Sequence, residues 1–252
     1  MKRRPLLPAM ALAMASLTAL PAQALDLEDM SQPEREAFRA EIRAYLLDNP
    51  EVIMEAVAVL EQRQAEAQAQ NDVDMVQSNS DAIFNDGHSW VGGNPKGDIT
   101  LVEFMDYKCG YCKRAFPEVN DLLEFDGNIK LIVKEFPILG EQSVLSARFA
   151  IATLQTQGDE AYEQVHDALM AFSGDITKTT LDRMAQGFGL DVEAITAHMD
   201  SDEVDTVIAE NRALAQRLNI SGTPSFVMND QMLRGYLPLD EMQRVAAEIR
   251  ED

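Results

Sequence analysis

The chain contains two cysteines among its 252 residues, and they stand three positions apart in the sequence Cys109-Gly110-Tyr111-Cys112. Two thiols at this spacing, at the start of a helix, can close into a small disulfide and reopen. A helix N-terminus stabilises negative charge, which favours the thiolate form of Cys109, the form that attacks a disulfide. The motif therefore predicts thiol–disulfide exchange in which Cys109 is the nucleophile. The redox-active disulfide Cys109–Cys112 would carry the electrons, with no added cofactor.

Other uses of such a cysteine pair fit the sequence less well. A zinc site would need a second pair or a Cys/His cluster, and the sequence has neither. Lys113 occupies the position where covalent haem attachment requires histidine. A structural disulfide would not need to stand between a strand and a helix. We assign no metal ligand, but paired thiolates also suit the soft ion Cu(I), so a copper-handling protein is the alternative from another functional class.

Glu103 interrupts the apolar run Leu101–Met105, six residues before Cys109. At the edge of a sheet such a residue would simply face solvent. In the middle of a central strand, a charged carboxylate would cost several kcal/mol unless it stays protonated or carries protons. We expect Glu103 to lie buried beneath the cysteine pair. There it would accept the proton of Cys112 when that thiol attacks a mixed disulfide.

Thr223-Pro224 precedes the β-prone segment Ser225–Asn229. A proline at this point is compatible with an ordinary trans turn. Because proline cannot donate a ladder hydrogen bond, its presence favours the end of a strand, here beside the active site. A second proline, Pro117, lies inside the helix predicted after the cysteines and is expected to kink it.

The elements around these residues form a strand–helix–strand unit, which is the building block of an α/β fold. The first strand is a near-continuous β-prone run, typical of a central strand covered on both faces. A long helical stretch, a hairpin and a closing helix complete the chain. The predicted ranges are strands 99–105 and 129–136, helix 111–125, helical residues 141–218, hairpin strands 225–229 and 231–235, and helix 238–250.

Two helices and a polar stalk precede this unit. Ser31 and Glu34 have the spacing of a capping box at the start of the first helix. Apolar residues then recur on one helical face. Two short helices cannot bury a core of their own, so we expect residues 25–80 to pack on the main domain or on copies of themselves. Glycine and proline indicate a linker over residues 81–97.

Residues 1–24 have the three parts of a cleaved signal peptide. A basic start is followed by the apolar run Leu6–Leu20 and by Ala22-Gln23-Ala24, which has the small-x-small form of a cleavage site. The run is short for a membrane span. The formal net charge of −22 repels phosphate backbones and anionic lipids, which argues against nucleic-acid and membrane-surface partners. From the signal-peptide pattern we expect an exported protein.

The stretch Gly93–Tyr107, leading into Cys-Gly-Tyr-Cys-Lys-Arg, resembles the DsbA-like branch of the thioredoxin superfamily, in particular its bacterial exported members. The resemblance covers about residues 31–252. It implies an α/β thioredoxin fold with an N-terminal helical extension. The catalytic domain would span residues 98–252, with an inserted helical domain at about 141–218.

The resemblance also implies a role for each site residue. A cis-proline segment would pair its exposed backbone with substrate chains, and the residues between the cysteines would complete the substrate-binding surface. The implied catalytic residues are Cys109 as attacking thiol, Cys112 as resolving thiol and Glu103 as buried acid, and the implied substrate-binding residues are Thr223, Pro224, Gly110 and Tyr111.

Two details bear on the subtype. Gly-Tyr between the cysteines and threonine before the proline look like disulfide isomerases of the DsbC type. Residues Tyr45–Glu55 are similar to ScsC-type exported disulfide isomerases, in which this region drives oligomerisation. An ordinary DsbA lacks such an extension. The resemblance thus implies a homo-oligomer, a dimer or trimer, assembled through residues 31–80.

Together these features predict a periplasmic thiol–disulfide oxidoreductase that isomerises or oxidises disulfides in exported proteins. The expected partners are unfolded or misoxidised exported proteins and a membrane redox partner. Two alternatives stay open: a monomeric DsbA-type disulfide oxidase, and a copper-tolerance protein that holds Cu(I). Rescue of a scrambled substrate by catalytic amounts would favour the enzyme, whereas stoichiometric Cu(I) capture without turnover would favour the copper-tolerance protein.

Overall fold

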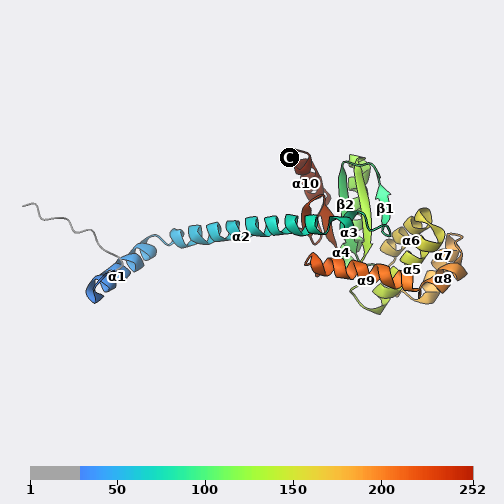
Figure 1. The fold of residues 1–252 in the computed structure, drawn as a ribbon, viewed down its shortest axis with the longest axis horizontal. Coiled ribbons are helices and arrows are strands. Elements are labelled where there is room, and N and C mark those ends of the chain that lie inside the picture. The colour runs from blue at the N-terminus through green and yellow to red at the C-terminus, as the bar shows by residue number, and fades with distance from the viewer. Residues whose placement is uncertain (1–28, 252) are drawn as a thin grey trace, which may run out of the picture. The chain divides into compact units, whose positions relative to one another are not determined.

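The structure, a computed structural model, describes residues 29–251. The predicted signal peptide, residues 1–24, therefore lies outside the described residues. The chain divides into two compact units, the first ending at Glu61 and the second beginning at Gln62. The second unit contains the sheet (Figure 1). Both cysteines also belong to this unit by their position in the chain.

The first unit consists of α1, Gln32–Asp48, and the first part of α2, Glu51–Ser78. The predicted capping box is confirmed: the Glu34 carboxylate accepts hydrogen bonds from the backbone N–H of Ser31 at 2.9 Å and from its hydroxyl at 2.6 Å. None of the 17 residues of α1 is buried in the described part of the chain. The apolar stripe predicted on this helix is therefore exposed in the single chain.

A five-stranded mixed sheet forms the centre of the second unit, in the order β1-β3-β2-β4-β5. β2 and β3 run parallel, and the other neighbouring strands pair antiparallel. β2 is thus the central strand, which confirms the predicted α/β fold. The strands are β1 Trp90–Gly93, β2 Ile99–Met105, β3 Ile129–Glu135, β4 Ser225–Met228 and β5 Gln231–Arg234.

Apart from α3, Ser80–Phe84, the helices that begin in this unit fall where the sequence predicts them. The short helix α3 lies at the start of the stretch predicted to be a linker. One helix joins the two parallel strands, five fill the stretch predicted as helical, and one closes the chain. They are α3 Ser80–Phe84, α4 Gly110–Asp126, α5 Glu141–Gln157, α6 Asp159–Ala171, α7 Lys178–Gly187, α8 Val192–His198, α9 Asp202–Arg217 and α10 Leu239–Glu251.

Both faces of the sheet are covered, because successive side chains of a strand point to opposite faces. Leu101 and Met105 of β2 belong to the larger core, which includes residues of α4, α5, α6 and α10. Val102 and Phe104 point the other way and pack with residues of α2, α3 and α9. The central strand is therefore apolar on both sides, as its sequence predicts.

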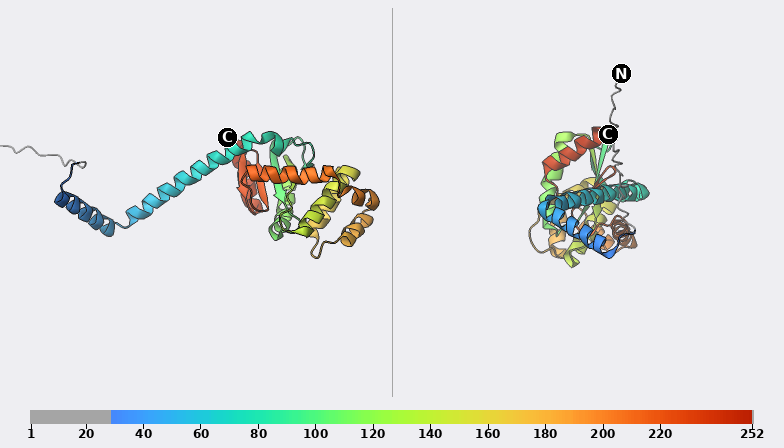
Figure 2. Two further views of the ribbon diagram at one scale, coloured as in Figure 1. Left: turned by 60° about the horizontal axis from the view of Figure 1, so that its bottom comes forward. Right: turned by 90° about the vertical axis from the view of Figure 1, so that its left-hand side faces the viewer.

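Helices α5 to α8 gather in one group beside β1 (Figure 1), and α9 runs back from this group along the sheet (Figure 2). Val207 and Ile208 of α9 pack in the core that contains α5. Leu214 and Ala215, further along α9, pack in the core under β2. The stretch predicted as helical therefore begins in the group of helices beside β1 and ends with α9 packed against the sheet.

The predicted linker at residues 81–97 is wrong in part. Residues Trp90–Gly93 form the edge strand β1, which pairs antiparallel with β3. Trp90 is buried and stacks on Tyr162, with ring centroids 5.4 Å apart. Four residues that end in two glycines carry no strand periodicity. The strand therefore forms because the indole ring of Trp90 is buried against the domain, and the β-propensity of its residues contributes little.

The predicted N-terminal region, residues 25–80, also extends too far. Val76 of α2 is buried in the same core as Ile83 and Val102. Asp72 of α2 forms a two-pronged ion pair with Arg234 of β5. The last part of α2 therefore belongs to the sheet domain, and only the residues up to Glu61 lie outside it.

A buried ion pair anchors the loop before β1 to the sheet. The Lys134 side chain of β3 is fully buried; its ammonium group contacts the Asp86 carboxylate and donates to the Ala82 carbonyl at 2.9 Å. His88 lies 2.9 Å from the same carboxylate. Burial alone would raise the pKa of Asp86, but its hydrogen bonds to His88 and Lys134 outweigh burial and hold that pKa well below its usual range.

Asp86→Asn is expected to lower the free energy of unfolding by about 3–5 kcal/mol, because it leaves the Lys134 ammonium group without an opposite charge in the interior. Denaturant titration at pH 7 measures the loss. Asp81→Asn changes an exposed acid of α3 and is the matched control. It should stay within about 0.5 kcal/mol of the parent. Equal stability of the two variants would show that the pair contributes nothing.

Candidate active site

Cys109 caps the N-terminus of α4 in an extended backbone conformation. Its backbone N–H donates to the Asp106 carbonyl at 3.0 Å, which closes a tight turn between β2 and the helix. The residue is 7 % exposed. At this position the sulfur is carried by the residue that stands at the partially positive N-terminus of the helix.

Cys112 lies in the first turn of α4 and is completely buried. Burial raises the pKa of its thiol far above the usual range, and the nearby negative charges of Glu103 and Cys109 raise it further. Both thiols are free. Cys109 is thus the more exposed thiol, and Cys112 is a buried thiol that keeps its proton. An attacking thiol and a resolving thiol are expected to differ in this way.

Glu103 occupies the centre of β2, between β3 and β4, and is 3 % exposed. It points to the face covered by α4, and its charge acts on Cys112. Burial raises the pKa of Glu103 to about 8. Its Oε1 atom has no hydrogen-bond partner among the described residues. The structure therefore places a buried, protonated carboxyl group beside the cysteine pair, where the sequence predicts one.

The Thr223–Pro224 peptide bond is cis and lies beside the cysteines. The Cys109 thiol donates to the Thr223 carbonyl, with sulfur and oxygen 3.1 Å apart. A groove of about 260 Å³ runs along this segment and is lined by residues 219–225, Arg234 and Gly235. The cysteines do not line this groove themselves, but Thr223, which does, is the residue whose carbonyl oxygen contacts the sulfur of Cys109.

The residues between the cysteines are accessible. Tyr111 is 63 % exposed, and a side chain at Gly110 would meet no atom within 4 Å. The Tyr111 ring lies 6.4 Å from the ring of Tyr236, and the Arg114 guanidinium group stands 4.5 Å from the centre of the Tyr236 ring. Tyr236 therefore extends the surface around Cys109. Sequence reasoning missed it, because it lies in the loop after β5 and belongs to no motif.

Asp106 holds the loop that carries Cys109, and sequence reasoning missed this residue too. One of its carboxylate oxygens accepts from the backbone N–H of Lys108 at 2.8 Å. The other accepts from the backbone N–H groups of Ile138 at 2.8 Å and Leu139 at 3.0 Å. The buried carboxylate thus joins the loop after β2 to the loop after β3. An aspartate directly after a strand is the signal for such a turn.

A second buried glutamate, Glu135, stands at the end of β3 beside Met105 of β2. Its Oε1 atom accepts hydrogen bonds from the hydroxyl groups of Tyr107 and Tyr162, both at 2.7 Å. His166, to which the sequence assigns no role, lies 3.0 Å from the Tyr107 hydroxyl. The sequence signal for Glu135 is weaker than the one for Glu103, because Glu135 is the last residue of its strand and follows a lysine.

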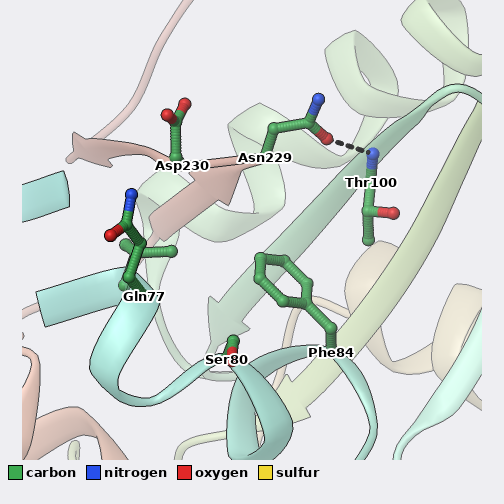
Figure 3. A pocket seen from close by; sticks show the side chains of 7 residues that line it. Gln77, Ser80, Phe84, Thr100, Asn229 and Asp230 are labelled. Carbon is green, nitrogen blue, oxygen red and sulfur yellow. Dashed lines mark hydrogen bonds between the residues drawn. The ribbon is translucent and has the colours of Figure 1, made fainter. Parts of the chain in front are cut away.

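A separate cavity of about 310 Å³ opens at the start of β2 (Figure 3). The backbone N–H of Thr100 donates to the Asn229 side chain across its rim at 2.9 Å. Because Cys109 follows the opposite end of β2, this cavity lies away from the cysteines, and we assign it no part in exchange. It is lined by Val76, Gln77, Ser80, Phe84, Thr100, Asn229 and Asp230.

Two further searches cover residues 29–251. No group of three or more histidine, cysteine or acidic side chains in this range is placed to hold a metal ion. No helix in the same range is long and apolar enough to cross a membrane.

Alkylation of the reduced protein at mildly acidic pH tests the assigned difference between the thiols. Iodoacetamide should label Cys109 at least about tenfold faster than Cys112, because Cys109 is partly exposed, whereas Cys112 is completely buried and burial raises the pKa of its thiol. Peptide mapping by mass spectrometry measures both rates. In the Cys109→Ser variant, Cys112 should be labelled only after denaturant has unfolded the protein. Earlier labelling of Cys112 would reverse the assignment.

Two family matches cover most of the described chain. Residues 100–247 match the family described as DSBA-like thioredoxin domain. Residues 34–67 match the family described as copper resistance protein ScsC N-terminal domain. The two matches correspond to the sheet domain and to the N-terminal helices.

Solved structures show the same likeness. A thioredoxin-like oxidoreductase from Silicibacter pomeroyi DSS-3 is 44% identical, with a TM-score of 0.65 over 68% of this chain and 98% of that one. Proteus mirabilis ScsC in a transitional conformation is 25% identical, with a TM-score of 0.64 over 87% of this chain and 98% of that one. The thioredoxin fold predicted from the sequence is thereby confirmed.

Among curated proteins, the Na(+)/H(+) antiporter NhaA 1 of Salinispora arenicola is 30% identical over 146 residues. That match covers 58% of this chain and 22% of the antiporter, so this chain spans about a fifth of such a relative. The matched DSBA-like segment is more than half of the chain and contains Glu103, both cysteines and the Thr223–Pro224 segment. The chain therefore belongs to the DsbA-like thioredoxin family.

Proposed function

We propose that this protein is a thiol–disulfide oxidoreductase that exchanges disulfides in exported proteins of the periplasm. The observation that carries the proposal is the placement of Cys109 at the N-terminus of α4, 3.1 Å from the Thr223 carbonyl, with Cys112 and Glu103 buried nearby. Family membership and the likeness to a thioredoxin-like oxidoreductase support this chemistry. The signal-peptide pattern of residues 1–24 supports the location.

A client protein binds as an extended chain in the groove along Thr223 and Pro224. Its backbone pairs with the backbone of this loop, as in other additions of a strand to an exposed edge. Tyr111 and Tyr236 add aromatic surface beside the sulfur. Recognition through the main chain does not depend on the client's sequence. This suits an enzyme whose clients are unfolded or misoxidised proteins.

The first chemical step is attack of the Cys109 thiolate on a client disulfide. A bond forms between Cys109 and one client sulfur, and the client S–S bond breaks, releasing the other client sulfur as a thiolate. Enzyme and client are then joined as a mixed disulfide. The released thiolate can attack a different disulfide of the client, which forms a new client disulfide and frees another client thiolate; that thiolate then attacks the mixed disulfide at the client sulfur. This sequence isomerises the client and regenerates reduced Cys109.

Cys112 ends the reaction when the client does not rearrange. In those molecules in which Glu103 has lost its proton, its carboxylate takes the proton of the Cys112 thiol, and the resulting thiolate attacks the sulfur of Cys109. The Cys109–Cys112 disulfide forms and the client leaves as a thiolate, so the client is reduced by two electrons and the enzyme is oxidised. Oxidation of a client runs these steps in reverse, and Glu103 then returns the proton to Cys112. A membrane redox partner resets the cysteine pair.

The N-terminal unit joins copies of the chain into a dimer or trimer. Nine large apolar side chains of this unit are exposed, a density that favours an interface, and residues 34–67 match the ScsC N-terminal domain family. In an oligomer, a client released from one active site meets another at high effective concentration, which favours isomerisation. The exposed apolar residues are Phe38, Ile42, Tyr45, Leu47, Ile53, Met54, Val57, Val59 and Leu60.

Refolding of a scrambled, disulfide-bonded substrate tests the proposed activity. The mature chain should restore the substrate in catalytic amounts, and Cys109→Ser should abolish rescue because it removes the nucleophile. Cys112→Ser should accumulate mixed disulfides, visible on non-reducing gels, because it removes the resolving thiol. No rescue by the parent, together with stoichiometric capture of Cu(I) without turnover, would instead favour the copper-handling alternative.

A chain that begins at Gln62 separates the two directions of exchange in the same assay. The cut leaves the core around Val76 and Ile83 intact. We expect a monomer by light scattering that oxidises a dithiol peptide at the parent's rate and loses most of the rescue of scrambled substrate. A parent chain that is already monomeric at micromolar concentration would refute the oligomer and leave a DsbA-type oxidase.

A further inference from the structure

The mechanism uses one of two glutamates that are buried on the same face of the sheet. β2 and β3 are parallel neighbours in which Met105 pairs with Glu135 and Glu103 pairs with Val133. Glu103 and Glu135 therefore lie diagonally across adjacent strands and point to the face that α4 and α6 cover. No lysine or arginine among the described residues pairs with either carboxyl group, and Lys134, next in sequence, pairs with Asp86 on the opposite face.

The surroundings of Glu135 form a directed set of hydrogen bonds. Tyr107 and Tyr162 both donate to its Oε1 atom at 2.7 Å. The single hydroxyl hydrogen of Tyr107 is used in that bond, so the Nδ1 atom of His166, 3.0 Å away, must carry a proton and donate to the Tyr107 oxygen. Burial lowers the pKa of His166 to about 4, so the ring is neutral at pH 7. The two phenols thus donate to Glu135 directly, and His166 donates to one of those phenols.

Five titratable groups face Glu135 from the elements packed against it. They are two carboxyl groups, two phenols and an imidazole, and none of them is a cation at neutral pH. Burial raises the pKa of Glu135 to about 8, the two phenol hydrogen bonds lower it, and the charges of Asp106 and Glu103 raise it again. The five groups are Glu103, Asp106, Tyr107, Tyr162 and His166.

Glu103 and Glu135 cannot ionise independently. Two carboxyl groups that share a site of low dielectric constant lose their protons in two separate steps, because the first negative charge opposes the second. Glu135 has two phenol donors, whereas Oε1 of Glu103 has no partner among the described residues. Donors favour the charged form, so the first charge falls on Glu135. The coupling through which a charge on Glu103 raises the pKa of Glu135 is reciprocal, so a charge on Glu135 makes Glu103 hold its proton more firmly.

We propose that Glu135 is a positioning residue for disulfide exchange: its charge controls how firmly Glu103 holds the proton that it exchanges with Cys112. This inference rests on the proposed role of Glu103 as proton carrier. Tyr107, Tyr162 and His166 act by fixing that charge on Glu135. Glu135 itself touches neither sulfur and takes no part in bond formation.

The resolving step provides the readout. Mixing the reduced protein with a chromogenic aromatic disulfide releases one coloured thiolate when Cys109 attacks and a second when Cys112 resolves. The rate of the second release rises with pH as Glu103 loses its proton. In Glu135→Gln the neighbouring charge is gone, so the midpoint of this rise should move to lower pH by about one unit. The first release should keep the parent's rate.

Three further variants separate this role from a merely structural one. Tyr162→Phe keeps the ring stacked on Trp90 and removes one donor, so it should move the midpoint in the same direction by less. If the Glu135→Gln variant does not fold, Tyr162→Phe provides the test in its place. In a Glu103→Gln background, Glu135→Gln should have no further effect on the pH profile. Glu124→Gln, an exposed glutamate of α4, should leave the profile unchanged.

An unchanged midpoint, or a shift to higher pH, in folded Glu135→Gln or in Tyr162→Phe would overturn the proposed role of Glu135. Both releases would then still occur in the parent, and the exchange function would stand. A parent protein that shows no second release would overturn the exchange mechanism and, with it, the role of Glu135.

Discussion

The burial of an unpaired carboxyl group in the central strand is the constraint on which the rest of this structure depends. Burial raises the pKa of Glu103 from 4.5 to about 8. Since the folded state therefore keeps a proton that the unfolded chain has lost, the stabilisation present at acidic pH is lost as the pH rises from about 4.5 to about 8. Each unit of displacement corresponds to about 1.4 kcal/mol. Such a group persists only where its surroundings hold it in place.

The surroundings do so through packing and through the turns that follow the strands. β2 is paired on both sides, with Val133 and Phe226 in register with Glu103. Asp106 binds the loop after β2 to the loop after β3, and this loop sets Cys109 at the N-terminus of α4. One rigid unit thus holds together a slightly exposed thiol, a completely buried thiol and a buried acid. The helix dipole acts on the first, and desolvation acts on the other two.

Much of this site could be predicted because its signals are local. Cys109 and Cys112 are the only cysteines, and Glu103 is conspicuous in an apolar run. What escaped prediction depends on partners distant in sequence. β1 is a strand because Trp90 packs on Tyr162. Its four residues, two of them glycine, give no sequence signal for a strand. Glu135 lies at a strand end, where an acidic residue commonly faces solvent, and only the fold brings two tyrosines to it.

The boundary of the N-terminal region shows the same limit of local pattern. The second half of α2 is rich in glutamine and acidic residues, so its sequence predicts an exposed stalk. Val76 and Asp72 nevertheless anchor it to the sheet domain, through the core and through Arg234. Helix α2 therefore serves two purposes along its length. Its first part carries exposed apolar residues, and its last part is a structural element of the catalytic domain.

Direct titration of Glu103 in the reduced, full-length protein is the measurement that tests this account most directly. Carbon-13 NMR of the glutamate side-chain carboxyl carbons follows each titration, and Glu103→Gln identifies the resonance by its loss. The account predicts a midpoint near pH 8 for this carboxyl group. A midpoint near 4.5 would contradict it, because Glu103 would then be an ordinary ionised carboxylate at neutral pH, unable to hold the proton exchanged with Cys112.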